Sequence, residues 1–361
     1  MKELIPAALV LSLAAAPHAQ QPDEPPQGQW TVIEHEDGRS EEGYLLDGSR
    51  VGHWTIRFPH GSVWSGPYVN GMRHGLWHQV DGGTSYTTYY VRGSDIDNAF
   101  RIEVDDGDSL QRFMEAAGVG VNERVFNYGR ETYLHAAIDL AQPIEVVRTL
   151  LDLGADPNLE GIGRASPMWA AIPYGRCSSY DLDVLDELVN AGGDATVSNS
   201  ASGTLLHAFA LVRECSDAMA GAFVNRLTAL GLDIDARNEN GTTPLNLAAR
   251  QRRSVSVVRA LIESGADLNS RDRFGRTPLH NVIGDPPRDE AEQLEVILVH
   301  ARTDRQIARQ QSDIGLLLLE NGADPNVPEN YGKTPLDGID EDTPLRRTRF
   351  YRQLLRRTQT R

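Results

Sequence analysis

Two short motifs alternate along most of the chain at a fixed distance, and this regularity restricts the possible fold more than any other feature. The first motif is Gly-x-Asp, and the second is a tetrapeptide that begins with Thr or Ser. The distance from the glycine to the next Thr or Ser is always 12 residues: 154→166, 192→204, 231→243, 265→277 and 322→334. From Thr or Ser to the next glycine, the distance varies from 22 to 45 residues. Such a period predicts an array of similar structural units, each packed on its neighbours.

The residues of both motifs are those that begin and end helices. Thr or Ser serves as a helix N-cap, and Pro fits the first turn because the N–H that it lacks has no partner there. Glycine suits the left-handed residue that follows a helix. Each unit is therefore predicted to hold two short helices. The tetrapeptides are Thr132-Tyr133-Leu134-His135, Ser166-Pro167-Met168-Trp169, Thr204-Leu205-Leu206-His207, Thr243-Pro244-Leu245-Asn246, Thr277-Pro278-Leu279-His280 and Thr334-Pro335-Leu336-Asp337.

This pattern resembles the ankyrin repeat family over about residues 98–340. The resemblance implies helix pairs joined by hairpins, in a solenoid that uses its surface to bind other proteins. The segment from Asp106-Gly107-Asp108 to Gly118 and Asn122 resembles a divergent first repeat that would cap the stack, so about six repeats are expected.

All variation in repeat length falls between the two helices of a repeat, whereas the connecting hairpin keeps its length. The largest insertion lies within residues 281–313. There, Asp285-Pro286-Pro287 predicts the start of an additional helix, with Leu294, Ile297 and Leu298 on its apolar face.

Residues 30–93 contain a second, shorter repeat that is rich in aromatic residues and glycine. Four of the five Trp fall here, and the octapeptide DGSRVGHW at residues 47–54 recurs 23 residues later as NGMRHGLW. Asp-Gly and Asn-Gly are typical of hairpin turns, and Tyr44, Tyr68 and Tyr90 each precede such a turn glycine by three or four residues. The G-x-W and Y-x-x-G signature resembles the MORN repeat of exported bacterial proteins. It implies a small antiparallel sheet with a core of stacked aromatic rings.

Both repeats together predict a mainly α fold, in which an ankyrin α-solenoid of about six repeats follows a small antiparallel MORN-like sheet. The C-terminal residues 345–361 hold seven Arg and no acid, with Phe350, Leu354 and Leu355 at helical spacing, and predict an amphipathic capping helix. The expected order is a signal peptide at 1–19, a linker at 20–29, MORN-like repeats at 30–93, the ankyrin domain at 94–340 and the basic helix at 341–361.

The first residues predict export. An apolar run from Leu4 to Ala16 follows Lys2 and ends shortly before the small residue Ala19, which is the layout of a cleaved secretory signal peptide. The alternatives are an uncleaved anchor or a plain apolar helix, although about 13 residues are few for crossing a bilayer. We therefore expect a periplasmic or secreted protein.

Charge and motif content argue against several classes of function. A formal charge of −16 disfavours nucleic-acid binding, because affinity for phosphates requires dense positive charge. No Gly-rich phosphate loop, H-E-x-x-H or C-x-x-C motif occurs, so we expect no enzyme activity, no cofactor and no metal. The histidines of the aromatic segment also lack the spacing of a zinc site: His53, His60, His74 and His78. The ankyrin resemblance implies that the tetrapeptide histidines bond the backbone near the hairpins: His135, His207 and His280.

We expect a monomeric interaction scaffold that binds a protein partner through its hairpin tips and concave face. Phe274 and Tyr331 each precede a hairpin glycine, where the turn should direct the ring outward, and aromatic residues and Arg dominate binding energy at interfaces. Solvated loops with chance aromatics are the simpler alternative. The candidate residues are Arg237, Asn238, Glu239, Asn240, Arg271, Asp272, Arg273, Phe274, Glu329, Asn330 and Tyr331.

Two other functions agree with the same sequence. One is an envelope or membrane-surface adaptor that uses the MORN-like sheet or the Arg-rich tail for peripheral contact with a membrane. The other is a secreted effector. A repeat surface has no chemistry that names its ligand, so the sequence does not identify the partner.

The only two cysteines, Cys177 and Cys215, lie 11 residues after Ser166 and Thr204, respectively, and so occupy equivalent places in consecutive repeats. Equivalent positions in stacked helical repeats lie on the order of 10 Å apart, whereas bridged Cα atoms lie about 4.4–6.8 Å apart. The extra residues in both interhelical loops could close this gap, and export would favour oxidation. We predict a disulfide, with two buried thiols as the alternative.

Overall fold

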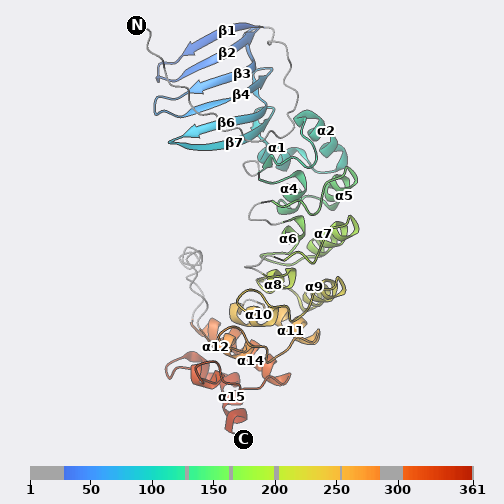
Figure 1. Ribbon diagram of the computed structural model, residues 1–361, viewed down its shortest axis with the longest axis vertical. Coiled ribbons are helices and arrows are strands. Elements are labelled where there is room, and N and C mark those ends of the chain that lie inside the picture. The colour runs from blue at the N-terminus through green and yellow to red at the C-terminus, as the bar shows by residue number, and fades with distance from the viewer. Residues whose placement is uncertain are drawn as a thin grey trace, which may run out of the picture. The chain divides into compact units, whose positions relative to one another are not determined.

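The computed structural model describes residues 28–126, 130–161, 166–198, 203–252, 254–284 and 304–359. Contacts divide the chain into two compact units, one ending at Tyr133 and the other beginning at Leu134 (Figure 1). The predicted signal peptide lies outside the described residues, as does the predicted additional helix at 285–298. Within the described ranges, no helix is both long and apolar enough to cross a bilayer.

The first unit contains one antiparallel sheet in the order β1-β2-β3-β4-β6-β7-β8, with β5 pairing to β4. Its strands follow one another in the chain because each is joined to the next by a tight turn. The strands are β1 Gln29–Glu34, β2 Ser40–Leu46, β3 Ser49–Arg57, β4 Val63–Val69, β5 Met72–Arg73, β6 Gly75–Asp81, β7 Thr84–Val91 and β8 Ser94–Asp95.

The 23-residue period is visible in the core of the sheet. The indole N–H of Trp54 donates to Tyr44 O at 3.1 Å, and that of Trp77 donates to Pro67 O at 3.0 Å. Both indoles are fully buried, each against a glycine on which a Cβ would stand 2.4 or 2.5 Å from the ring: Gly43 under Trp54 and Gly66 under Trp77. The glycines of the repeat are therefore required by close packing as well as by the turns.

One predicted equivalence is wrong, because a β-bulge lies between Glu42 and Tyr44. Tyr44 pairs with Val51, whereas Leu45 pairs with Arg50 and packs on the buried aromatic cluster. Leu45 therefore takes the place that Tyr68 and Tyr90 take in later repeats. Tyr44 lies on the other face of the sheet, edge to face with Trp30, which is 52% exposed.

Two helices continue the first unit beyond the position near residue 93 at which we expected the domain boundary. They are α1 (Ile96–Glu103) and α2 (Gly107–Ala117). The Tyr89 hydroxyl of β7 donates to Ala117 O at 2.8 Å, which joins α2 to the sheet. Phe100, Phe126 and Tyr133 form one aromatic cluster, with centroids 5.1 and 4.9 Å apart along that series. The segment that resembles a first repeat, which contains α2, thus belongs to the unit that contains the sheet.

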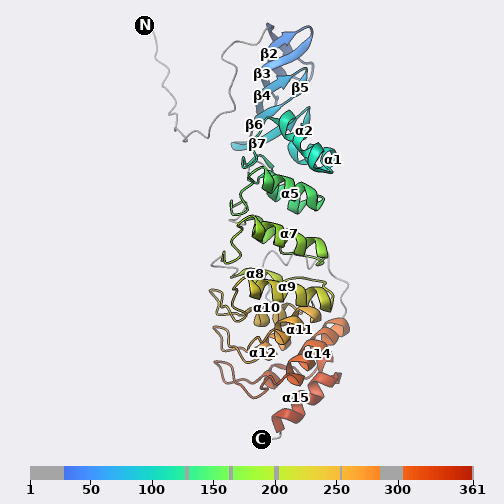
Figure 2. The ribbon, with the colours of Figure 1, turned by 90° about the vertical axis from the view of Figure 1, so that its right-hand side faces the viewer.

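The second unit alternates short first helices with longer second helices, and the loops between repeats project to one side of the stack (Figure 2). The pairs are α4 (Tyr133–Asp139) with α5 (Ile144–Asp152), α6 (Pro167–Ala170) with α7 (Ser179–Asn190), α8 (Leu205–Phe209) with α9 (Asp217–Ala229), α10 (Pro244–Gln251) with α11 (Val255–Glu263), and α12 (Pro278–Ile283) with α14 (Asp304–Glu320).

The helix ends agree with the motif prediction. The glycine of every Gly-x-Asp has a positive φ of 88–103°, as a left-handed residue after a helix requires. Thr243 caps α10 by accepting the N–H of Asn246 at 3.3 Å. α14 begins at Asp304, so residues 304–313 of the predicted insertion belong to a second helix.

The C-terminal residues cap the last repeat. A 3₁₀ turn, η2 (Pro335–Gly338), and a second one, η3 (Pro344–Arg347), lead into α15 (Arg349–Gln359). Phe350 and Leu354 of α15 are fully buried, and the Phe350 ring lies against Gly315 of α14, where a Cβ would stand 2.4 Å away. The apolar stripe of the Arg-rich helix therefore packs on the stack.

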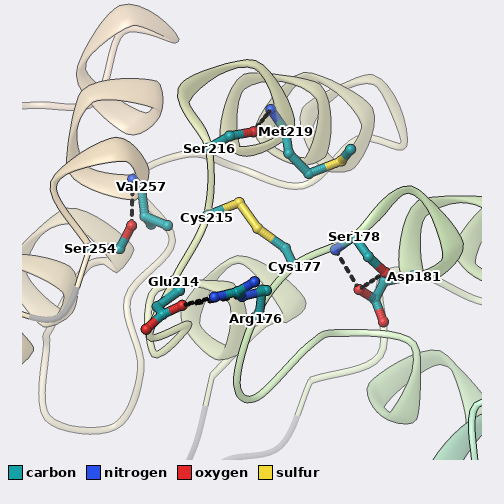
Figure 3. The surroundings of a disulfide bond; sticks show 10 residues. All are labelled: Arg176, Cys177, Ser178, Asp181, Glu214, Cys215, Ser216, Met219, Ser254 and Val257. Atoms are coloured by element: carbon teal, nitrogen blue, oxygen red, sulfur yellow. Dashed lines mark hydrogen bonds and ion pairs between the residues drawn. A yellow bond between two sulfur atoms is a disulfide. The ribbon is translucent and has the colours of Figure 1, made fainter.

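The predicted disulfide is present between the loops that follow α6 and α8 (Figure 3). The Cα atoms of Cys177 and Cys215 are 5.2 Å apart. The loops approach as an isolated parallel bridge between Arg176 and Glu214, whose side chains also form an ion pair at 2.8 Å. Cys177 N donates to Glu214 O at 2.9 Å. The extra loop residues thus bring the two cysteines closer together than equivalent positions of rigidly stacked helices would be.

Replacing both cysteines by Ser should lower the free energy of unfolding by about 3–4 kcal/mol, because the unfolded chain loses a cross-link between residues that are 38 apart. Urea denaturation measures this change, and reduced wild-type protein should match the double variant. Titration of two free thiols in denatured, unreduced protein would contradict the bond.

Replacing Arg92 by Asn should raise the free energy of unfolding of the first unit by up to about 1 kcal/mol. Arg92 has φ 47° at the turn position that Asp47 and Asn70 fill in earlier repeats, and a left-handed conformation is costly for Arg. Its ion pair with Glu103, at 3.9 Å between exposed groups, contributes little. The converse change, Asn70→Arg, should lower the free energy of unfolding of the first unit. Equal urea denaturation midpoints for the wild type, Arg92→Asn and Asn70→Arg would refute the argument.

Candidate functional site

Three consecutive hairpins, at residues 237–242, 271–276 and 329–333, form what we call the hairpin surface. Each is closed in the same way, because an Asn, Asp or Glu begins the turn and a glycine with positive φ completes it. The closing bonds are Asn238 N to Thr242 O and Gly241 N to Asn238 O, Asp272 N to Arg276 O and Gly275 N to Asp272 O, and Glu329 N to Lys333 O and Gly332 N to Glu329 O, all between 2.8 and 3.1 Å.

Backbone hydrogen bonds join each of these hairpins to the next. Arg273 N donates to Asn240 O at 3.1 Å, and Asn330 N donates to Phe274 O at 3.0 Å. Donors and acceptors occupy equivalent positions in successive repeats. The bonds follow from the constant 12-residue connection, because hairpins of equal length place the same backbone groups opposite one another.

Arginine side chains form a second set of links along the surface. Arg237 Nη1 donates to Arg271 O at 2.6 Å, and Arg271 Nη2 donates to Pro328 O at 2.9 Å. Each acceptor is the residue equivalent to its donor in the next repeat. The two guanidinium groups are thus held in place while both side chains stay exposed.

The candidate residues come together on this surface, but they differ in exposure. Phe274 is 41% exposed and Tyr331 is 78% exposed, as the turn geometry predicted. Four candidates are half-buried and support the turns: Asn238, Asn240, Asp272 and Glu329. The other five are exposed: Arg237, Glu239, Arg271, Arg273 and Asn330.

Two further residues belong to this surface although the sequence analysis did not include them. Arg276 places its guanidinium carbon 5.5 Å from the centre of the Phe274 ring, and Arg273 lies 4.7 Å from the same ring. Lys333 is exposed at the position equivalent to Arg276. Both follow a hairpin glycine directly, in Gly-Arg-Thr and Gly-Lys-Thr, so their position in the repeat could have identified them.

Histidines of the first helices anchor two of the hairpin bases. His207 Nε2 bonds Thr242 O at 2.9 Å, and His280 Nε2 bonds Lys333 O at 3.0 Å, while each Nδ1 accepts the N–H of the Thr that begins the tetrapeptide. Burial lowers the pKa of both imidazoles from its ordinary value, more than the bonds to the carbonyl oxygens raise it. In the repeat between them, Asn246 instead bonds Ser270 O at 3.1 Å.

The chemistry that this surface offers is recognition. Its exposed groups are guanidinium ions and an ammonium ion, which pair with carboxylates, and two aromatic rings, which pack against apolar side chains, together with the Glu239 carboxylate and the Asn330 amide. In the described ranges, no three side chains of His, Cys, Asp or Glu lie together so that they could hold a metal ion.

Family comparisons identify the repeats. The family model described as "Ankyrin repeats (3 copies)" matches residues 168–272, and the model described as "Ankyrin repeat" matches residues 130–162. The first of these segments includes the whole of the hairpin at residues 237–242 and ends at the second residue of the hairpin at 271–276.

Curated relatives match part of this chain. The human protein "SH3 and multiple ankyrin repeat domains protein 2" is 33% identical over 135 residues, which are 36% of this chain and 6% of that protein. "Neurogenic locus notch homolog protein 1" of Mus musculus is 31% identical over 154 residues, 43% of this chain and 5% of that protein. The chain thus spans about a twentieth of the length of these relatives.

A solved structure supports the fold. The crystal structure of the human ASB11 ankyrin repeat domain aligns with a TM-score of 0.50 and 22% identity, and it covers 72% of this chain and 96% of that one.

The free energy of unfolding of the second unit should fall as the pH drops through about 6.5, because the unfolded histidines take up protons there and the buried ones resist. The slope should be at most about 1.4 kcal/mol per pH unit for each histidine, and the loss should level off below the folded pKa values. His207→Asn and His280→Asn should each make the free energy of unfolding less dependent on pH. Urea denaturation at several pH values between about 5 and 8, on either side of the ordinary histidine pKa of about 6.5, would measure this change. An unchanged slope in both variants would refute this role.

Proposed function

Since the chain contains ankyrin repeats, we propose that it is a non-enzymatic scaffold that binds a protein partner through the hairpin surface and the adjoining first helices. The observation that carries this proposal is the exposure of Phe274 and Tyr331 on hairpins that hydrogen bonds join into one array. An aromatic ring that is exposed yet held by a fixed backbone is typical of the residues that dominate binding energy.

Preorganisation supports the same conclusion. The backbone links at Arg273 and Asn330 and the side-chain links of Arg237 and Arg271 are complete without a partner. A partner would therefore lose less free energy to the ordering of these loops than it would on free loops.

We further propose that the protein is exported and acts in the periplasm or outside the cell as a monomer. The layout of residues 1–19 supports export, and so does the joining of the only two cysteines in a disulfide, since disulfides persist in oxidising compartments. The 23-residue repetition of buried Trp over Gly supports the proposal that the sheet is of the MORN type of exported bacterial proteins. A secreted effector remains within this proposal.

A second candidate function, that of a membrane-surface adaptor, is favoured by one face of the sheet. Trp30, Tyr44 and Val51 follow one another across β1, β2 and β3, and Trp30 is 52% exposed. Val69 and Met72 on the following strands are 49% and 46% exposed. The Arg-rich tail supports this candidate less, because Phe350 and Leu354 are buried against the stack.

Substituting Phe274 or Arg273 by Ala should weaken partner binding by about 1–2 kcal/mol and leave folding intact, because both side chains are exposed. Affinity capture of the exported protein with its partner, followed by titration of the purified pair, measures the effect. Tyr86→Ala and Arg352→Ala, which remove an exposed ring and an exposed guanidinium elsewhere, serve as matched controls. Binding that survives both hairpin substitutions would move the interface to residues 281–313 or to the sheet.

If the adaptor function holds, the full-length mature chain should pellet with anionic vesicles, and Trp30→Ser with Val69→Ser should reduce the bound fraction several-fold. Removal of residues 345–361 tests the tail separately. A bound fraction no greater than that of the protein alone would exclude this candidate.

A further inference from the structure

The hairpin surface differs in charge from the rest of the chain. Its three hairpins hold five basic residues and three acidic ones, a formal charge of 5 − 3 = +2, whereas the whole chain carries −16. The basic residues are Arg237, Arg271, Arg273, Arg276 and Lys333.

Two of the three carboxylates are engaged within the surface. Asp272 Oδ1 accepts the N–H groups of Phe274 and Arg276, both at 2.9 Å. Glu329 pairs with Arg276 at 3.1 Å, and its side chain is only 9% exposed. Only Glu239 is both acidic and exposed here.

Most of the cations, in contrast, lack a carboxylate partner. Across the described residues, Arg237, Arg271, Arg273 and Lys333 form no ion pair. The guanidinium groups of Arg237 and Arg271 use single nitrogens to bond the backbone of the next hairpin, so the other donors of each fork stay available. Carboxylates fit such forks because two parallel N–H···O bonds can form.

An apolar contact lies beside these cations. Phe274 is flanked by Arg273 and Arg276, at 4.7 and 5.5 Å from the ring centre, and its backbone carbonyl bonds the hairpin that bears Tyr331. An exposed aromatic ring thus lies beside Arg273, which forms no ion pair across the described residues, and a second exposed ring, that of Tyr331, occupies the equivalent position on the next hairpin.

We propose that the hairpin surface binds an acidic segment of the partner protein, whose Asp and Glu side chains pair with Arg237, Arg271 and Arg273 while an apolar side chain packs on Phe274 or Tyr331. This inference rests on the proposed function and adds the chemistry of the partner. A protein segment fits this surface better than a nucleic acid does. A long phosphate backbone would be repelled by the rest of a chain whose formal charge is −16, whereas a short cluster of carboxylates would contact only the cations of the hairpin surface.

The test uses the full-length mature chain and a displayed library of random 12-residue peptides. Peptides selected on the wild-type protein should be enriched in Asp and Glu next to an aliphatic or aromatic residue. Their dissociation constants, measured by fluorescence anisotropy, should rise at least tenfold in the double variant Arg273→Glu with Lys333→Glu, and they should also rise with salt. Neither side chain donates a hydrogen bond to another of the described residues, and circular dichroism would verify that the variant folds.

A matched control separates the site from net charge. Arg347→Glu with Arg352→Glu changes the charge of the chain by the same amount at exposed positions near the C-terminus, and it should leave the dissociation constants unchanged. Equal weakening by both double variants would overturn the proposal.

The remaining outcomes distinguish this inference from the proposed function. Selected peptides without acidic enrichment that still lose binding on Phe274→Ala would leave the scaffold function standing and overturn the acidic partner. Failure of the selection to yield peptides that bind the hairpin surface would overturn both. The selected peptides should not be displaced by a 12-nucleotide single strand or by phosphatidylglycerol vesicles at equal concentration. Displacement by either would show that the surface prefers another polyanion, and it would overturn the proposal of an acidic protein segment.

Discussion

Hydrogen bonds that recur at equivalent positions hold three successive hairpins of the second unit in register, and the exposed features of these hairpins depend on them. The bonds from Arg273 N to Asn240 O and from Asn330 N to Phe274 O are the same bond made twice. They need hairpins of equal length, so any insertion in a hairpin would break the series. Insertions are found instead between the two helices of a repeat, and two of these longer loops are joined by a backbone hydrogen bond from Cys177 N to Glu214 O and by the disulfide.

In the first unit, a different contact keeps successive repeats in register. Its repeat depends on an indole that lies directly on a glycine of the preceding strand, at Trp54 over Gly43 and at Trp77 over Gly66. Because no other residue leaves room for the ring, the period of Trp and Gly could be detected in the sequence. A bulge next to Gly43 changes the register, and Tyr44 therefore points to the face opposite the one that its spacing predicted.

Local chemistry explains which predictions hold. Glycines after helices, capping threonines and Asp-Gly turns act within a few residues, and the structure has the positive φ and the caps that they require. The exposure of Phe274 and Tyr331 follows from the same local rule, because the residue before a hairpin glycine lies at the tip. The position of Arg276 directly after a hairpin glycine could have placed it on this surface, but no local motif could predict its ion pair with Glu329, which is 53 residues away in the sequence.

The sequence by itself determined the two repeat periods, the helix caps and the equal hairpins, and it predicted the cysteine pair, since each depends on a short motif or a constant spacing. Only the tertiary structure decided that α1 and α2 belong with the sheet, through Tyr89 and the aromatic cluster around Phe100. It also decided which charges of the hairpins are engaged and which stay available. These ion pairs and side-chain hydrogen bonds between repeats join residues that are 30 or more positions apart, and no local pattern records which of them will meet.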